Sequence, residues 1–467
     1  MALSSSTKLI KPGGFREFFR IAYPLVISNA ATTLMHFIDR LFLSWSSPEE
    51  FAACIPASVL AWTILSILVG ISEYSNSFVA QFYGAKRYAS IGATIWQGIW
   101  FSLFGGIVCL AFLPAGLMIF DHVGHPSDVI LHEKRYFSII LSGGVFFILK
   151  ESLSSFYSGR GKTKVIMAVN IIANLINAVL DYALIFGVGF IPAMGIRGAA
   201  LATLISIISA CLIFFALFAS ISNSRLYDTR RIRFDFPLMK RMIRFGAPSG
   251  VQFFLDISSF TVFVFIIGRL GKIELAVSNI ALSISSLAWL PMLGAAMATA
   301  TLVGQYIGRN DYETAEKSTY TALIAVEFYM ILFGLIYIFL PDLLLSLFQG
   351  ENTNTDIPFE DIQEYGRLIL LLVALYQIGD AMNITFSGAL RGAGDTSFAM
   401  RANIICSWIL FAPGTWLTVV FFQQGLIGAW CWATAYIILL GGVFFLRFRS
   451  GYWKTIRMIP ADSEETQ

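Results

Sequence analysis

Two similar stretches, VAQFYGAKRY at residues 79–88 and VGQYIGRNDY at residues 303–312, decide the fold. Both have Val, Gln, Gly and Tyr at the same four positions. Two more pairs of stretches match, and all three occur in the same order in each half. RIAYP and RFGAP, which begin at Arg20 and Arg244, come before the first pair, and GRGKT and GAGDT, which begin at Gly159 and Gly392, come after it. Three pairs in one order predict that the chain is a duplicated unit.

The composition predicts a membrane protein. Of the 467 residues, 57% are apolar and only 13% are charged, and the mean hydropathy is +0.73. Soluble domains carry about 25% charged residues, so a chain this apolar lacks the polar surface that it would need in water. The net charge of +3 gives no sign of a nucleic-acid partner. The basic N-terminus runs into a long apolar segment without a small-residue cleavage site, which predicts a retained first helix and not a signal peptide.

Twelve stretches are long and apolar enough to cross a bilayer, which takes about 20 residues in a helix. They fall at residues 16–44, 51–80, 89–118, 134–158, 164–189, 197–222, 238–268, 273–306, 314–345, 361–390, 397–423 and 425–448. Six spans in each repeat give both repeats the same orientation, so we expect an all-α integral membrane protein of two parallel six-helix bundles around a substrate cavity. The predicted parts are an N-terminal lobe at 1–222, a cytoplasmic basic linker at 223–244, a C-terminal lobe at 245–450 and a cytoplasmic tail at 451–467.

Lys and Arg set the predicted orientation, because cytoplasmic connections retain them. The two ends and the even-numbered connections hold most of the 32, with a dense group between the sixth and seventh spans. Both termini are therefore predicted to face the cytoplasm. The acidic stretch at 350–366 should then face outward; it could attract cations, although such a run is more often a solvated loop. The opposite side has only Lys134, Arg135, Arg197, Arg269, Lys272 and Arg367.

Polar side chains form a stripe on each of three predicted spans. Spacings of three and four residues put them on one helix face, and a charge deep in a span costs about 2.5–3.5 kcal/mol on insertion scales, so such a face should line a cavity. Oxygen atoms of this kind can bind a hard cation, and a desolvated carboxylate can instead carry a proton. Hydrogen bonding between helices is the structural alternative. The stripes are Asn170, Asn174, Asn177 and Asp181 in the fifth span, Ser249, Gln252, Asp256 and Ser259 in the seventh, and Tyr376, Gln377, Asp380 and Asn383 in the tenth.

Further ionisable residues lie within predicted spans at Asp39, Glu73 and Glu327. His36 precedes Asp39 by three residues and could relay a proton to it, although a hydrogen-bonded structural histidine is the more common case. Arg40 follows Asp39 directly and points about 100° away around the helix, so it need not neutralise that carboxylate.

Neither enzyme chemistry nor a cofactor is indicated. The sequence has no HExxH or GxSxG motif, and it has no nucleotide-binding domain that would drive transport with ATP. The cysteines fall in apolar stretches without paired spacing, which predicts buried thiols and not a disulfide framework or a metal site. They are Cys54, Cys109, Cys211, Cys406 and Cys431.

The chain resembles the multidrug and toxic compound extrusion (MATE) family over about residues 15–450, with some features of its NorM-like branch and some of its DinF-like branch. The stretches that carry the resemblance are VAQFYGAKR, GIRGAALAT, FGAPSGVQFFLD, VGQYIG and LYQIGDAMNITFSGALRGAGDT, together with Asp39 in the first span. The resemblance implies two six-helix bundles in a V around a central cleft. It also implies export of organic cations against an inward gradient of Na+ or H+.

The resemblance also implies the site residues. The NorM-like coupling-ion site in the C-lobe matches Asp256 and Asp380, with Tyr376, and the DinF-like ion or proton site in the N-lobe matches Asp39, Asn177, Asp181 and Thr203. Na+ could then bind at Asp256 and Asp380 or at Asp39 and Asp181. Two positions depart from the pattern, because the family usually has Glu where Asp256 stands and a small or polar residue where Arg40 stands. The supporting polar residues are Asn174, Gln252, Gln377 and Asn383.

The function expected from the sequence is a secondary active antiporter of a cell inner membrane. It would exchange small organic cations for Na+ or H+, with membrane lipid as its surroundings. Each chain contains both halves of the cleft, so a monomer is expected. The alternative from the same superfamily is a flippase for lipid-linked oligosaccharides or lipids. It would need a cationic cavity for pyrophosphate, and the carboxylate stripes argue against it.

Overall fold

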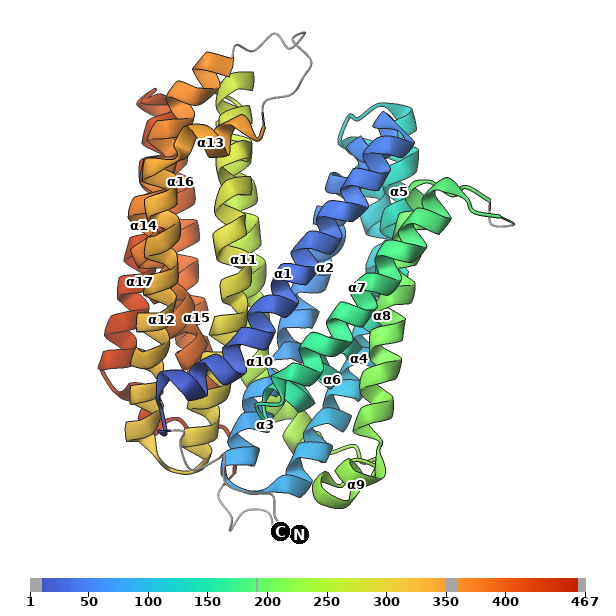
Figure 1. The fold of residues 1–467 in the computed structure, drawn as a ribbon, viewed down its shortest axis with the longest axis vertical. Coiled ribbons are helices and arrows are strands. Elements are labelled where there is room, and N and C mark those ends of the chain that lie inside the picture. The colour runs from blue at the N-terminus through green and yellow to red at the C-terminus, as the bar shows by residue number, and fades with distance from the viewer. Residues whose placement is uncertain (1–10, 190–191, 349–358, 461–467) are drawn as a thin grey trace. The chain divides into compact units, whose positions relative to one another are not determined.

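The computed structural model describes residues 11–189, 192–348 and 359–460. These residues form helices and connections with no β-strand among them (Figure 1). The first half contains α1 (Phe15–Ser46), α2 (Pro48–Glu73), α3 (Ser75–Gly84), α4 (Tyr88–His122), α5 (Ser127–Ser142), α6 (Gly144–Ser158), α7 (Thr163–Phe186), α8 (Ile196–Phe218) and α9 (Ile221–Tyr227). The second half contains α10 (Phe236–Ile267), α11 (Lys272–Gly308), α12 (Tyr312–Phe339), α13 (Pro341–Ser346), α14 (Phe359–Ala393), α15 (Thr396–Asn403), η2 (Ile404–Phe411), α16 (Ala412–Trp416), η3 (Leu417–Phe421), α17 (Gly425–Arg449) and η4 (Tyr452–Thr455).

The predicted spans are confirmed. In the described residues, eleven helices are long and apolar enough to cross a membrane, and the bent pair α5–α6 makes a twelfth. Part of the acidic stretch at 350–366 and part of the tail at 451–467 lie outside the described residues.

The fourth span differs most from the prediction. It begins at Ser127 instead of residue 134, and it bends by 44° between α5 and α6. The earlier start adds two charged residues that lie outside the predicted span, Asp128 and Glu133. Asp128 is exposed in the first turn of α5, and Glu133 pairs with His125 at 2.7 Å. Pairing lowers the cost of placing a charge at the end of a span, which explains why the helix extends through Glu133.

Three other boundaries move for backbone reasons. The fifth span ends at Phe186 instead of residue 189, because Gly187 has a φ of 76° that stops the helix. The ninth ends at Phe339, because Pro341 starts the separate helix α13. The eleventh span is not a regular α-helix, because it contains the π-helical segments η2 and η3 on either side of α16, where Pro413 lacks a backbone N–H.

The repeat appears in the helices as well. The second span, α2 with α3, and the eighth, α11, are each 37 residues long, and they end in the matching stretches that define the repeat. These ends cross at very short range. A Cβ atom added to Gly84 would lie 2.0 Å from the Gln305 carbonyl oxygen, and one added to Gly308 would lie 2.1 Å from that of Gln81. The Gly and Gln of each copy therefore meet the Gln and Gly of the other.

Contacts along the chain define two compact units. Unit 1 comprises 1–22, 254–303 and 312–456, and unit 2 comprises 23–253, 304–311 and 457–467. The predicted lobe boundaries remain a prediction.

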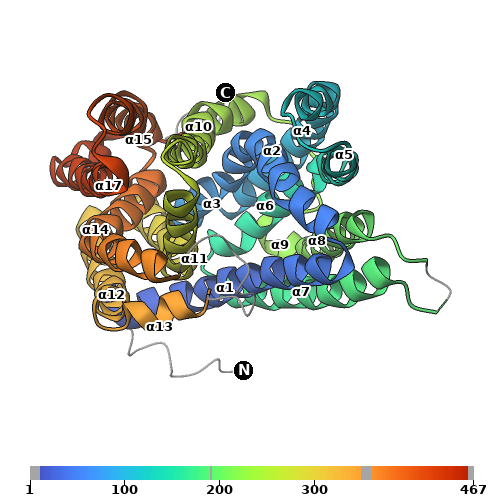
Figure 2. The same cartoon turned by 90° about the horizontal axis from the view of Figure 1, so that it is seen from above.

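In unit 1, α12, α14 and α17 pack side by side (Figure 2), and the Phe411 ring stacks on Tyr436 at 4.8 Å. In unit 2, a buried cluster that includes Leu65, Phe137 and Ile148 joins α2, α5 and α6. The part of α1 in unit 2 runs beside α7 (Figures 1 and 2).

The glycine crossing is testable by substitution. Gly84→Ala and Gly308→Ala should each lower the stability of the purified protein by about 1–3 kcal/mol, because the added methyl group meets backbone that cannot turn away. Thermal unfolding in detergent, followed by tryptophan fluorescence, measures the loss. Gly442→Ala is the matched control, because no atom lies within 4 Å of its added Cβ. Equal melting temperatures for all three variants would show that the crossing is not a tight contact.

Candidate functional site

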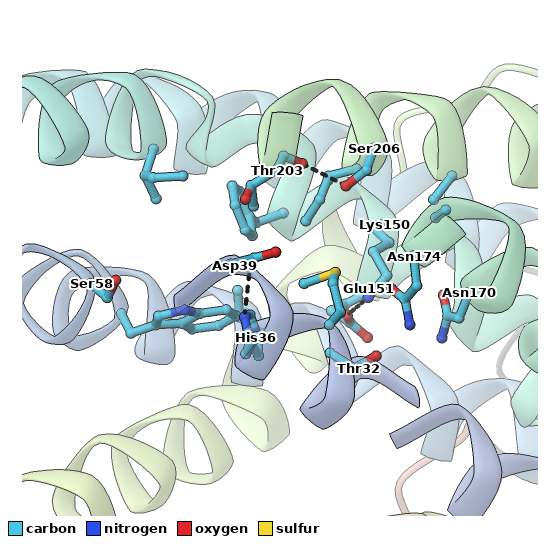
Figure 3. Close-up of a pocket in the computed structure, with 18 of the residues that line it drawn as sticks. Thr32, His36, Asp39, Ser58, Lys150, Glu151, Asn170, Asn174, Thr203 and Ser206 are labelled. Atoms are coloured by element: carbon cyan, nitrogen blue, oxygen red, sulfur yellow. Dashed lines mark hydrogen bonds and ion pairs between the residues drawn. The ribbon is translucent and has the colours of Figure 1, made fainter. Parts of the chain in front are cut away.

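Unit 2 encloses a cavity of about 250 Å3 (Figure 3). Its walls come from α1, α2, α5, α6, α7 and α8. The apolar part includes Trp62, whose ring meets that of Phe147 edge to face at 5.8 Å. The polar part includes the predicted site residues Asp39, Asn174 and Thr203. An apolar pocket with a few convergent polar groups is the usual form of a small-molecule site.

The fifth-span stripe faces the interior of unit 2. Asn170 and Asn174 line the cavity, whereas Asn177 and Asp181 are fully buried and are not among its lining residues. The Asn170 amide donates a hydrogen bond to Ser28 Oγ on α1 at 2.7 Å. Asp181 lies within electrostatic range of Asp39 and of Asn177. The structure therefore brings the predicted N-lobe residues of α1 and α7 together.

Several of these buried polar atoms have no hydrogen-bond partner among the described residues. They include both carboxylate oxygens of Asp181, both amide atoms of Asn177, and Oδ1 of Asp39. The other Asp39 oxygen lies 3.9 Å from His36 Nδ1, which is an ion-pair distance if the histidine is protonated. Buried polar groups are normally hydrogen-bonded, and those that are not need a specific explanation. One explanation is that these oxygens bind a ligand that protein groups do not replace.

Two charged residues of the cavity wall, Lys150 and Glu151, were not among the predicted site residues. They form an ion pair at 3.0 Å on α6, and both line the cavity. The signal was present, because two adjacent charges stand in an otherwise apolar stretch, FFILKESL. Spacing arguments did not select them, since neighbours in sequence do not share a helix face.

Unit 1 holds the predicted C-lobe residues. Asp380 on α14 is 6% exposed and lies within electrostatic range of Asp256 on α10. Tyr376 is buried, and its hydroxyl lies 2.9 Å from Ser285 Oγ on α11. Of the supporting residues, Gln377 is buried, and the Asn383 side chain lies within hydrogen-bonding reach of the Asp380 carboxyl. Gln252 is buried on α10 but falls in unit 2.

Asp256 has two partners that the site prediction did not include. The Asn403 amide donates a hydrogen bond to Asp256 Oδ1, and the Tyr436 side chain lies within hydrogen-bonding reach of the same carboxylate. Ser407 Oγ in turn donates to Asn403 Oδ1 at 3.0 Å, which fixes the orientation of the amide. Asn403 directly precedes the π-helical segment η2, and π-helical turns are frequent at functional sites.

The remaining predictions concern metal ligands and cysteines. The described residues contain no group of three or more His, Cys, Asp or Glu side chains that could hold a metal ion. The predicted Na+ site has only two carboxylates, and its other oxygen ligands come from amide and hydroxyl groups, so it would not form a group of three His, Cys, Asp or Glu side chains. The prediction of buried thiols is correct for four cysteines and wrong for Cys431, which is exposed on α17. A cysteine in an apolar span can face the lipid as well as the interior, and hydropathy does not separate the two cases.

Comparisons with known proteins agree with this architecture. The MatE family model matches residues 24–183 and again 248–417, one match in each repeat. The probable multidrug resistance protein NorM of Thermotoga maritima is 27% identical over 445 residues, which cover 94% of this chain and 93% of that protein. The NorM of Shewanella oneidensis is 26% identical, with 94% and 96% covered.

Solved structures show the same fold. A MOP superfamily transporter from Pyrococcus furiosus superimposes with a TM-score of 0.85 at 21% identity, over 97% of this chain and 100% of that one. The eukaryotic MATE transporter AtDTX14 gives a TM-score of 0.83 at 21% identity, over 94% and 96%. Because the family model matches both repeats and more than half of the chain, the chain belongs to the MatE family of membrane transporters.

Proposed function

We propose that this protein is a secondary active antiporter that exports organic cations and other drugs in exchange for Na+ or H+. The observation that carries the proposal is the Asp181 carboxylate, which is fully buried and has no hydrogen-bond partner on either oxygen among the described residues. The protein's membership of the MatE family supports the proposal that it is a transporter. So do its relatives that are named as multidrug resistance proteins.

Asp181 is fully buried beside a second carboxylate, Asp39. Two carboxylates so close together in a membrane interior cannot both be ionised without a large cost, so the pair gains stability by binding a cation or a proton. A bound Na+ would have oxygen ligands from Asp39, Asp181, Asn177 and Thr203, which suit a hard cation. A proton needs only one carboxylate oxygen. Either ion changes the charge beside the cavity by one unit, which couples its binding to that of a charged substrate.

The unit 1 carboxylates provide a second candidate for the coupling site. Asp256 already accepts a hydrogen bond from Asn403, so its charge is better stabilised than that of Asp181. Asp380 lies near Asp256 and feels its charge, which makes double ionisation of the pair unfavourable. We therefore propose that Asp181 is the principal exchange site and that the Asp256–Asp380 pair supplies a further one. The available energy is sufficient, since one charge crossing 100 mV yields about 2.3 kcal/mol.

One observation favours the alternative, a flippase for lipid-linked oligosaccharides. Two cationic side chains, Arg40 and Lys150, line the unit 2 cavity, and a pyrophosphate group would need such charges. They are offset there by Asp39 and Glu151, so the net field is not cationic. This balance makes the antiporter the better-supported function.

Reconstituted vesicles test the proposal. Wild-type protein should move a fluorescent organic cation under at least one of two imposed gradients, of Na+ or of pH, and the one that works identifies the coupling ion. Asp181→Asn should reduce this movement most, because a neutral amide cannot exchange a charge, and Asp380→Asn should reduce it less, because it removes only the further site. Asp128→Asn, at an exposed position on α5, is the control. Normal gradient-driven transport by Asp181→Asn would remove that residue from the mechanism.

The proposed location is the inner membrane with both termini in the cytoplasm. In a Cys431→Ser background, a cysteine placed at Asp128 should react with a membrane-impermeant maleimide in intact cells. A cysteine placed at Arg231 should react only after permeabilisation, because it lies in the basic connection. Both positions are exposed. Labelling of the Arg231 position in intact cells would reverse the proposed orientation.

A further inference from the structure

The connection between α8 and α10, residues 219–235, joins two spanning helices through the short helix α9 (Figure 1). Hydrogen bonds from α4 fix its backbone within unit 2. The Trp96 indole donates to the Thr229 carbonyl at 2.9 Å. The Gln97 side chain donates to the Arg233 carbonyl, also at 2.9 Å. The connection is therefore an ordered part of the fold.

A close backbone contact holds the connection at a third point. A Cβ atom added to Gly92 on α4 would lie 2.2 Å from the Tyr227 carbonyl oxygen. The Tyr227 ring is buried, with the Phe156 ring at 5.4 Å and the Arg160 guanidinium at 4.5 Å. Because its backbone is held in this way, the connection cannot turn its exposed side chains into the interior.

The side chains that the connection exposes are of two kinds. Four are large and apolar and between 52% and 64% exposed: Ile221, Leu226, Ile232 and Phe234. Four are exposed arginines: Arg225, Arg230, Arg231 and Arg233. We call these eight side chains the linker surface. Moving one large apolar side chain out of water is worth about 1.5–3 kcal/mol, so this surface is most stable where an apolar phase covers it.

The connection also has a net positive charge. Its four arginines outnumber its two aspartates, Asp228 and Asp235. Asp228 lies 3.8 Å from Arg231, and Asp235 accepts a hydrogen bond from the first turn of α10 at 3.0 Å. These contacts engage both carboxylates, so they leave Arg225 and Arg233 available to an anion outside the chain.

The surface of the bilayer fits both kinds of side chain. The connection follows α8, which ends at Phe218, and precedes α10, which begins at Phe236, so it lies within reach of lipid headgroups. Segments that combine exposed apolar and basic side chains bind at the membrane interface. Arginine there keeps its stem in apolar surroundings and its guanidinium group at the phosphates. Basic groups next to a spanning helix attract anionic lipid by about 1 kcal/mol each.

We propose that the linker surface is a membrane-interface anchor that binds anionic phospholipid. Its apolar side chains enter the boundary between headgroups and acyl chains, and its arginines bind the lipid phosphates around them. This inference concerns residues of unit 2 alone and does not depend on the antiport proposed above.

Quenching by brominated lipids tests the anchor. In a Cys431→Ser background, Ile232→Cys carries the apolar fluorophore bimane, and the purified protein is placed in nanodiscs of phosphatidylglycerol and phosphatidylcholine in equal amounts. Bromine on the acyl chains of one lipid or of the other reports which of them lies beside the probe. Phosphatidylglycerol should be enriched about fivefold there, which corresponds to about 1 kcal/mol. Both leaflets contain both lipids, so the result does not depend on the orientation of the protein.

Removing charge should abolish the enrichment. Arg225→Gln, Arg231→Gln and Arg233→Gln together should make the two brominated lipids quench equally. Arg230 is kept, because its Nε donates to the Ala219 carbonyl at 2.9 Å and so holds the connection. High salt measures the same effect without any arginine substitution: it should reduce the enrichment, because salt screens exposed charges.

The controls separate the linker surface from other parts of the chain. Three exposed arginines of unit 1, Arg16, Arg401 and Arg449, are replaced by Gln in the matched charge control, which should keep the enrichment at Ile232. Bimane on Phe328→Cys reports on ordinary lipid contact, because Phe328 is 74% exposed on the spanning helix α12. The two brominated lipids should quench that probe equally.

Three outcomes would overturn the proposal. The first is quenching of the Ile232 probe by iodide in solution and by neither lipid, which is the result for a surface that faces water or an acidic protein. The second is equal quenching by the two brominated lipids in the protein with all its arginines. The third is an unchanged enrichment both in the triple variant, shown to be folded by its melting temperature, and in high salt.

Discussion

The free-energy cost of an unpaired charge inside a membrane constrains this structure more than any other interaction. A charged side chain in the middle of a span costs several kcal/mol unless it has a partner or faces a cavity. Two pairs beside the unit 2 cavity meet this condition: Lys150 pairs with Glu151 at 3.0 Å, and Asp39 lies 3.9 Å from His36. Asp181 does not, since it is fully buried without a hydrogen bond among the described residues. A fold that retains such a residue gains stability when an ion binds there, and this is the physical basis of the proposed coupling.

The helices that carry these groups depend on close backbone packing. Gly84 and Gly308 allow the repeated stretches of the second and eighth spans to cross where any side chain would collide with a carbonyl oxygen. Between membrane helices the hydrophobic effect contributes little, so such contacts between small residues supply much of the packing energy. The duplication thus provides a reciprocal contact within unit 2 as well as two sets of carboxylates.

Much of this could be predicted from the sequence, because spans and stripes depend on local patterns. The twelve spans are confirmed, and Asp39, Asn174 and Thr203 do line a cavity. The 44° bend in the fourth span and the π-helical segments were not predictable, since they depend on pairing and packing with other helices. Lys150 and Asn403 were not predicted for different reasons. Lys150 pairs with its neighbour Glu151, a spacing that helical periodicity does not select, and Asn403 donates a hydrogen bond to Asp256, 147 positions away.

Exchange is a reciprocal relation, so a substrate gradient should drive the coupling ion as surely as the ion drives the substrate. The most direct measurement therefore uses vesicles loaded with an organic cation, with no gradient of Na+ or pH and with the membrane potential clamped. The account predicts that exit of the organic cation brings Na+ or protons into the vesicles, detected by an enclosed ion-sensitive dye, and that Asp181→Asn strongly reduces this entry. Exit of the organic cation through wild-type protein with no movement of either ion would contradict the account.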